Sequence, residues 1–168
     1  MPRQHASDVV VQEVVELRRK GFRFILLADD NFYPVTQQDV ELEERRSGAR
    51  VEELKAIRAE RFELLDRLAE LPQDMVFLTQ ITMEAADDDE YLDAMKRANV
   101  KGALVGVESV TEEGLKAVFK DFNVAGDDLV DRLRKFVDHD VHILGSFIFG
   151  LSTDRDDTFD ATADLAAK

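Results

Sequence analysis

Hydrophobic and polar positions alternate in blocks along this chain, and the blocks predict strands separated by helices. Each of the apolar blocks is rich in Val, Ile, Leu and Phe and follows a charged segment with apolar residues at helical spacing. Runs of this kind between amphipathic helices predict parallel strands that are buried on both faces. The predicted strands are Phe22–Ala28, Met75–Ile81, Gly102–Val107 and Val141–Phe149.

The helices are predicted from the spacing of apolar residues and from signals at their ends. Ser7 and Thr111 are expected to cap two of them, and Pro72 is expected to end another. The alternation of helix and strand predicts an α/β fold with a parallel sheet and right-handed crossovers. The predicted helices are Ser7–Lys20, Val51–Leu71, Asp87–Asn99, Thr111–Lys120, Asp127–His139 and Asp154–Lys168.

Four such units can form a small open sheet or an arc of a barrel. The chain begins with a helix before its first strand and ends within a helix, so we expect a single partial barrel domain over residues 1–168. An arc has unpaired edge strands and exposed apolar faces, which favour self-association. The polar segment Pro34–Arg50, with a short helix near Asp39–Arg46, is expected to be a surface insertion.

Charge and composition exclude several classes of function. The 36 acidic and 22 basic residues give a net charge of −14, which opposes binding to nucleic acid. The chain has no cysteine, which excludes disulfides, thiolate zinc sites and a cysteine-ligated cluster on this polypeptide. No apolar run is long enough to span a bilayer, so we expect a cytoplasmic protein without membrane contact.

Polar residues and glycines follow the predicted strands, where parallel α/β sheets gather their ligands. We therefore expect these residues to lie on one rim. The candidates are Asp29, Asp30 and Asn31 after the first strand, Gln80 in the second, Glu108 and Ser109 after the third, and Gly145 and Gly150 in and after the fourth.

Each candidate also has a structural explanation. Asp30 and Asn31 are favoured in turns, although adjacent carboxylates also bind an ammonium group or a metal. Gln80 is expected to be buried and so to need partners, and Glu108 is costly at the end of an apolar run without one. Ser109 is suited to capping the next helix. The glycines either allow close strand packing or let a ligand lie against the backbone.

Several runs at these strand ends resemble radical S-adenosylmethionine (SAM) enzymes. The resemblance is strongest to the cobalamin-binding class, including proteins like the anaerobic magnesium-protoporphyrin monomethyl ester cyclase, and covers roughly residues 8–168. The runs are FILLADDNF (24–32), the strand-end Gln80, GALVGVES (102–109) with LKAVFKDFN (115–123), and HILGSFIFG (142–150) with LSTDRDDTF (151–159).

The resemblance implies a partial (β/α)6 TIM-like barrel, of which this chain would supply strands two to five. In the family, a three-cysteine loop after the first strand binds a [4Fe–4S] cluster that generates a radical from SAM for cyclase-like or methyltransferase-like chemistry. That loop is absent from this chain. The resemblance therefore implies an enzyme segment that is inactive alone, whose small-molecule substrate, possible cobalamin and metal cluster belong to the full-length protein.

The resemblance also implies roles for residues of the first two strands. Asp29, Asp30 and Asn31 match the position that meets the SAM amino group, and Gln80 matches a strand residue that faces the active centre. The usual Gly-Gly-Glu reads Ala28-Asp29-Asp30 here. Carboxylates suit an ammonium group at this position.

Residues of the last two strands match the remainder of the SAM site. Glu108 and Ser109 match the position that contacts the ribose or methionine part, and Lys120 matches a residue that approaches the SAM carboxylate. The stretch from Gly145 to Gly150 matches the glycine motif that flanks the adenine, although it lacks the usual Gly-x-Pro-x-Glu continuation.

Two other hypotheses follow from the residues alone. The chain would be a self-contained ligand-binding or regulatory α/β module with a flavodoxin-like layout, or a divalent-metal hydrolase that uses Asp29, Asp30 and Glu108.

Overall fold

The computed structural model describes residues 5–120 and 125–168. Residues 121–124, which include the end of the run 115–123, lie outside the described part, as do residues 1–4. No helix in the described ranges is long and apolar enough to cross a membrane. In chain order the elements are α1 (Ser7–Arg19), β1 (Phe24–Leu26), α2 (Gln37–Arg46), α3 (Val51–Ala69), β2 (Val76–Ile81), the 3-10 helix η1 (Met83–Asp87), α4 (Asp89–Arg97), β3 (Val100–Glu108), α5 (Glu112–Ala117), α6 (Gly126–Asp138), β4 (His142–Phe147) and α7 (Thr158–Ala166).

The strands form one four-stranded parallel sheet in the order β1-β2-β3-β4. Gln80 in β2 pairs with Leu104 in β3, which pairs with Leu144 in β4. The predicted parallel α/β sheet is therefore confirmed, and each strand lies beside the next one in sequence. A flavodoxin-like sheet reverses its strand order at a switch point. Since this sheet has no reversal, the flavodoxin-like layout is wrong.

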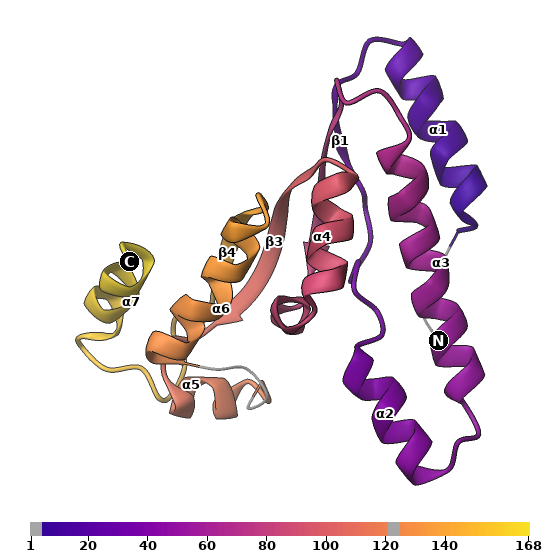
Figure 1. Ribbon diagram of the computed structural model, residues 1–168. Coiled ribbons are helices and arrows are strands. Elements are labelled where there is room, and N and C mark those ends of the chain that lie inside the picture. Colours follow the sequence, from indigo (N-terminus) through magenta and orange to yellow (C-terminus); the bar gives the residue numbers. More distant parts are fainter. Residues whose placement is uncertain (1–4, 121–124) are drawn as a thin grey trace.

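Only one face of the sheet is buried. The helix-facing side chains of Phe77 and Val105 are at most 1% exposed, whereas Phe24, Leu26 and Leu144 on the other face are 61–65% exposed. The prediction of burial on both faces is therefore wrong. The pattern is that of an arc of a TIM-like barrel, whose inner face meets other strands only when the barrel is closed. Figure 1 shows α1 beside α3 at one end of the arc and α7 at the other.

The ends of the elements follow local chemistry. Thr111 caps α5 as predicted, because its hydroxyl accepts a hydrogen bond from the Gly114 amide at 3.1 Å. The predicted cap at Ser7 is wrong, since Ala6 holds the N-cap position and Ser7 begins the helix. The Ser7 amide instead donates to Glu60 of α3 at 2.8 Å. This bond links the first turn of α1 to the helix on which α1 packs.

The segment Pro34–Arg50 contains a regular helix with a small core of its own. Thr36 and Asp39 form a capping box at the start of α2. Val40 of α2 packs with Val35 and Val51 in a cluster separate from the main core. The segment therefore attaches α2 to α3 beside the carboxyl end of β1.

Candidate functional site

A hollow of about 140 Å³ lies at the carboxyl ends of β1, β2 and β3. It brings together Asp30 from the loop after β1, Gln80 from β2 and Lys120 from the turn after α5. These were three of the residues predicted from sequence. A carboxylate, an amide and an ammonium group at one rim are suited to a small ligand with charges of both signs. The lining residues are Asp30, Gln80, Ile81, Thr82, Met83, Gly106 and Lys120.

Gln80 is exposed, so the expectation of a buried amide is wrong. The reason is strand alternation: its neighbours Thr79 and Ile81 face the helices and are 1% and 2% exposed, which leaves Gln80 on the open face. Its exposure on the inner face places Gln80 where a ligand at the rim would meet it.

Asn31 is used to join the ends of two strands. Its side-chain nitrogen donates to the Tyr33 carbonyl at 2.8 Å, and its oxygen accepts from the Tyr33 amide at 3.0 Å. The same oxygen accepts from the Thr82 amide after β2 at 3.3 Å. The Asn31 side chain is therefore occupied by these hydrogen bonds, and it does not line the hollow. Its neighbour Asp30 does line the hollow and is exposed.

Asp29 forms an ion pair with Arg61, which sequence reasoning missed. The distance from Arg61 Nη2 to Asp29 Oδ2 is 2.7 Å, and the Arg61 side chain is only 6% exposed. A signal for this pair was present in the sequence. Arg61 lies four residues after Ile57 and four before Leu65, within the apolar stripe of α3. A charged residue in such a stripe predicts a buried partner.

Glu108 ends β3 with an unusual backbone. Its φ is +67°, a conformation that costs a non-glycine residue on the order of 1 kcal/mol and is common at binding sites. Its carbonyl accepts from the Ile148 amide at 2.7 Å, which fixes the end of β4 beside it. The Glu108 carboxylate lies over Gly106, because a Cβ on Gly106 would be 2.5 Å from Glu108 Oε1. Since Gly106 lines the hollow, this carboxylate is next to it.

Ser109 is buried in the turn that begins α5. Its hydroxyl accepts from the Thr111 amide at 3.3 Å and lies 3.3 Å from the Thr111 hydroxyl. It also lies against Gly114, where a Cβ would overlap it. The predicted cap at Ser109 is therefore wrong: Thr111 holds the N-cap position of α5, and Ser109 stabilises the turn that precedes it.

The two glycines of the fourth run do not line the hollow. Gly145 lies inside β4, on the face where a Cβ would meet Val107 Cγ2 at 3.3 Å. The predicted strand end at Phe149 is wrong, since β4 ends at Phe147. Gly150 lies in the following loop, where its amide donates to Asp154 Oδ2 at 2.7 Å.

The residues present do not fit a metal centre. Within residues 5–120 and 125–168, no group of three or more His, Asp or Glu side chains is arranged to hold a metal ion. The arrangement that the metal-hydrolase hypothesis needs, with Asp29, Asp30 and Glu108 on one ion, is therefore absent from the described part. A [4Fe–4S] cluster also lacks ligands here, since the chain has no cysteine.

Replacing Gly106 with alanine is expected to move the Glu108 carboxylate without unfolding the protein. The new methyl group would occupy the space of Oε1, and the long Glu108 side chain can yield, so the stability should change by less than about 1 kcal/mol. Carboxyl ¹³C NMR of Glu108 and thermal unfolding measure the two effects. Gly102→Ala in the same strand, which meets Leu78 instead, is the control. An unmoved Glu108 signal in Gly106→Ala would contradict the prediction.

No family model matches the sequence, and no curated protein matches it. Solved structures do resemble it. One is the cobalamin-dependent SAM radical enzyme OxsB with aqua-cobalamin bound, with a TM-score of 0.70 at 14% identity over all of this chain and 24% of OxsB. OxsB with aqua-cobalamin and SAM bound gives a TM-score of 0.68 at 15% identity, over 100% and 24% of the two chains.

The radical SAM methyltransferase TsrM from Kitasatospora setae, solved with cobalamin and a [4Fe–4S] cluster, gives a TM-score of 0.67 at 16% identity. The match covers 97% of this chain and 28% of TsrM. This chain thus spans about a quarter of the length of these structures. At such identities the likeness shows the fold, and the chain has the fold of a segment of cobalamin-dependent radical SAM enzymes.

Proposed function

We propose that this chain is the central barrel segment of a cytoplasmic radical SAM enzyme of the cobalamin-binding class, and that its strand ends hold part of the SAM molecule. The observation that carries the proposal is the rim hollow, which brings Asp30, Gln80 and Lys120 together on the open face of the arc. The fold it shares with OxsB and TsrM supports the same assignment.

The chemistry of the hollow fits the charged end of SAM. Asp30 offers a carboxylate to the amino group, and Lys120 offers an ammonium group to the carboxylate. Glu108, adjacent over Gly106, offers a carboxylate to ribose hydroxyls. Cluster ligands, the substrate pocket and any cobalamin site would come from other parts of the full-length protein. Cyclase-like or methyl-transfer chemistry would be decided there, with a small molecule as the substrate.

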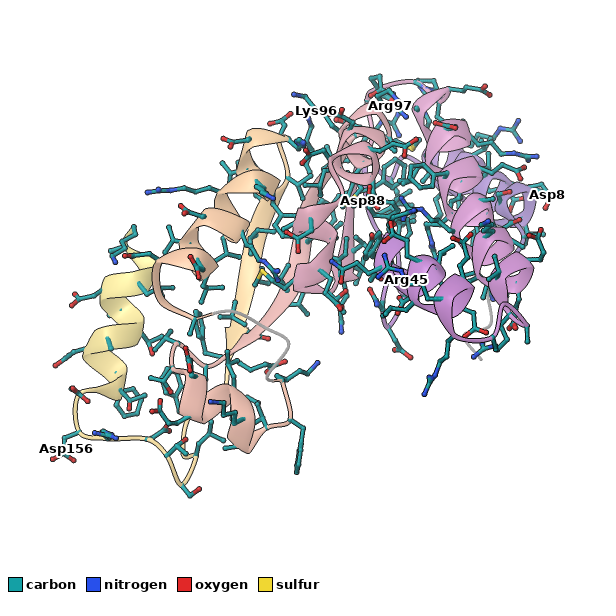
Figure 2. The ribbon with its side chains drawn as sticks, turned by 60° about the horizontal axis from the view of Figure 1, so that its bottom comes forward. Asp8, Arg45, Asp88, Lys96, Arg97 and Asp156 are labelled. Carbon is teal, nitrogen blue, oxygen red and sulfur yellow. The ribbon has the colours of Figure 1, made fainter. Side chains whose placement is uncertain are left out.

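Titration with SAM tests the proposal on this chain. We expect weak binding, on the order of millimolar, since no cluster holds the methionine end. In ¹H–¹⁵N NMR spectra SAM should shift the amide signals of Asp30, Gln80, Gly106 and Lys120. Asp30→Asn should weaken binding, because it removes the charge that faces the amino group. Asp156→Asn is the matched control, since Asp156 is exposed in the loop before α7 (Figure 2).

The proposal fails if SAM shifts none of these signals, or if Asp30→Asn and Asp156→Asn bind it equally. A second, independent test is the coding sequence that precedes Met1. A three-cysteine motif within about a hundred codons would support a shared radical SAM barrel, and its absence would contradict it.

A further inference from the structure

Arg61 is buried where an apolar residue would be expected. It lies in the middle of α3, and its side chain is 6% exposed. Burial of a guanidinium group costs free energy unless partners compensate, and replacement by apolar residues is often neutral or stabilising. Arg61 also keeps one unmet donor, because its Nε is buried without a hydrogen-bond partner. Stability alone therefore gives little reason for an arginine at this position.

The contacts of Arg61 converge on the loop after β1. Its Nη2 donates to Asp29 Oδ2 at 2.7 Å. Its guanidinium lies over the ring of Phe32, 4.2 Å from the ring centroid. Phe32 is 1% exposed, and its amide donates to the Gln80 carbonyl at 2.8 Å. Arg61 thus holds both sides of the short segment between Asp29 and Phe32.

This arrangement separates the roles of two adjacent carboxylates. Asp29 Oδ2 is bound to Arg61 and Asp29 Oδ1 accepts from the Asn31 amide at 3.2 Å, so both oxygens are used. Asp30 is exposed and lines the rim hollow with Gln80. Without the ion pair, only the single bond from the Asn31 amide would keep the Asp29 carboxylate from turning to the rim in place of Asp30. Arg61 therefore selects which carboxylate faces the hollow.

We propose that Arg61 is a positioning residue for SAM binding: through Asp29 and Phe32 it fixes the loop after β1 so that Asp30 faces the ligand. This inference rests on the proposed function for its ligand. The placement of Asp30 by Arg61 does not depend on the proposed function, and it can be measured in the protein without a ligand.

The test compares two arginines of the same helix. Arg61→Met removes the charge and keeps an apolar stem of similar length. Arg58→Met is the matched control, because Arg58 also lies over aromatic rings and is paired with a buried carboxylate, Asp88. Its contacts are to Tyr33, Phe62 and Asp88 instead of to Asp29 and Phe32. Asp29→Asn is the second variant; it breaks the same ion pair from the loop side with little change of shape.

Amide NMR signals of Asp30 and Asn31 in the free protein are the first readout. They should shift in Arg61→Met and Asp29→Asn and shift less in Arg58→Met, because Arg58 reaches Asn31 only through Tyr33. The affinity for SAM is the second readout, expected to fall about tenfold or more in the two variants and to stay unchanged in Arg58→Met. The double variant should lose no more than either single one, since both remove one interaction.

The outcomes separate the two proposals. Unchanged Asp30 and Asn31 signals in Arg61→Met, or equal shifts in Arg58→Met, overturn the positioning role whether or not SAM binds. A parent protein that does not bind SAM contradicts the proposed function, while the signals in the free protein still decide whether Arg61 positions Asp30. If Arg61→Met does not fold, Asp29→Asn decides by the same readouts.

Discussion

Replacing Asp88 with alanine is expected to lower the free energy of unfolding by about 3–5 kcal/mol. The Asp88 side chain is 8% exposed and its Oδ2 accepts from Arg58 Nη2 at 2.5 Å and from the Tyr33 hydroxyl at 2.7 Å. Its Oδ1 caps α4 by accepting from the Tyr91 amide at 3.1 Å. Alanine would leave the largely buried Arg58 guanidinium unpaired and the helix uncapped. Figure 2 shows Asp88 among the side chains between the sheet and α3.

Urea unfolding followed by circular dichroism measures this loss. Asp93→Ala on the same helix is the control, since its side chain is 61% exposed and the change should stay within about 0.5 kcal/mol. If Asp88→Ala and Asp93→Ala lowered the free energy of unfolding equally, the buried network of Asp88 would not stabilise the protein as its contacts indicate.

The ionisation of Tyr33 gives an independent readout of the same network. Burial, and next the hydrogen bond to Asp88, raise the pKa of the Tyr33 phenol well above its usual range. Because the pKa of Tyr33 is raised in the folded state, the neutral phenol contributes its full stabilisation below the ordinary pKa of about 10. This stabilisation is lost as the pH rises above that value. Asp88→Ala should therefore lower the pKa of Tyr33. Absorbance of tyrosinate during an alkaline titration of the parent protein and of Asp88→Ala measures the shift.

The order and type of most elements were predictable from sequence because they depend on local periodicity. The apolar stripe of α3 and the runs that form β2 and β3 are long enough to identify each element without tertiary information. The short helix η1 was not predicted separately from α4. Its five residues are too few to show a helical period.

The open face of the sheet could not be read from the same runs. Leu104 and Leu144 are apolar although they face away from the helices, because the inner face of a barrel arc has the composition of a core. A sheet covered on both faces and an arc thus give the same near-continuous apolar pattern. The expected burial of Gln80 was wrong for this reason.

The candidate site was predictable in position but not in detail. Parallel strands place their carboxyl ends on one rim, so Asp30 and Gln80 could be expected to meet. Lys120 follows a helix, and only the family resemblance placed it at this rim. The difference between Asp29 and Asp30 depends on Arg61, 32 residues after Asp29, and no local pattern reveals which of two adjacent carboxylates such a partner binds. Long-range contacts therefore decide which of two adjacent carboxylates faces the hollow.

Phe77→Ala and Phe24→Ala are expected to differ in their effect on the free energy of unfolding by about 2 kcal/mol or more, although the chemical change is the same. Phe77 is 1% exposed on the helix-facing side of β2, so its truncation should cost about 3–5 kcal/mol. Phe24 is 61% exposed on the open face of the neighbouring strand β1, so its loss should cost less than about 1 kcal/mol.

Urea unfolding at several protein concentrations measures both effects and examines the open face. A small, concentration-independent change in Phe24→Ala means that this face is in water in the isolated chain. A loss in Phe24→Ala that approaches that of Phe77→Ala and grows with protein concentration would mean that another copy covers the face, as apolar surface of this kind favours. Because barrel closure would bury Phe24 next to Leu26 and Leu78, the same substitution should be costly only where the rest of a barrel is present.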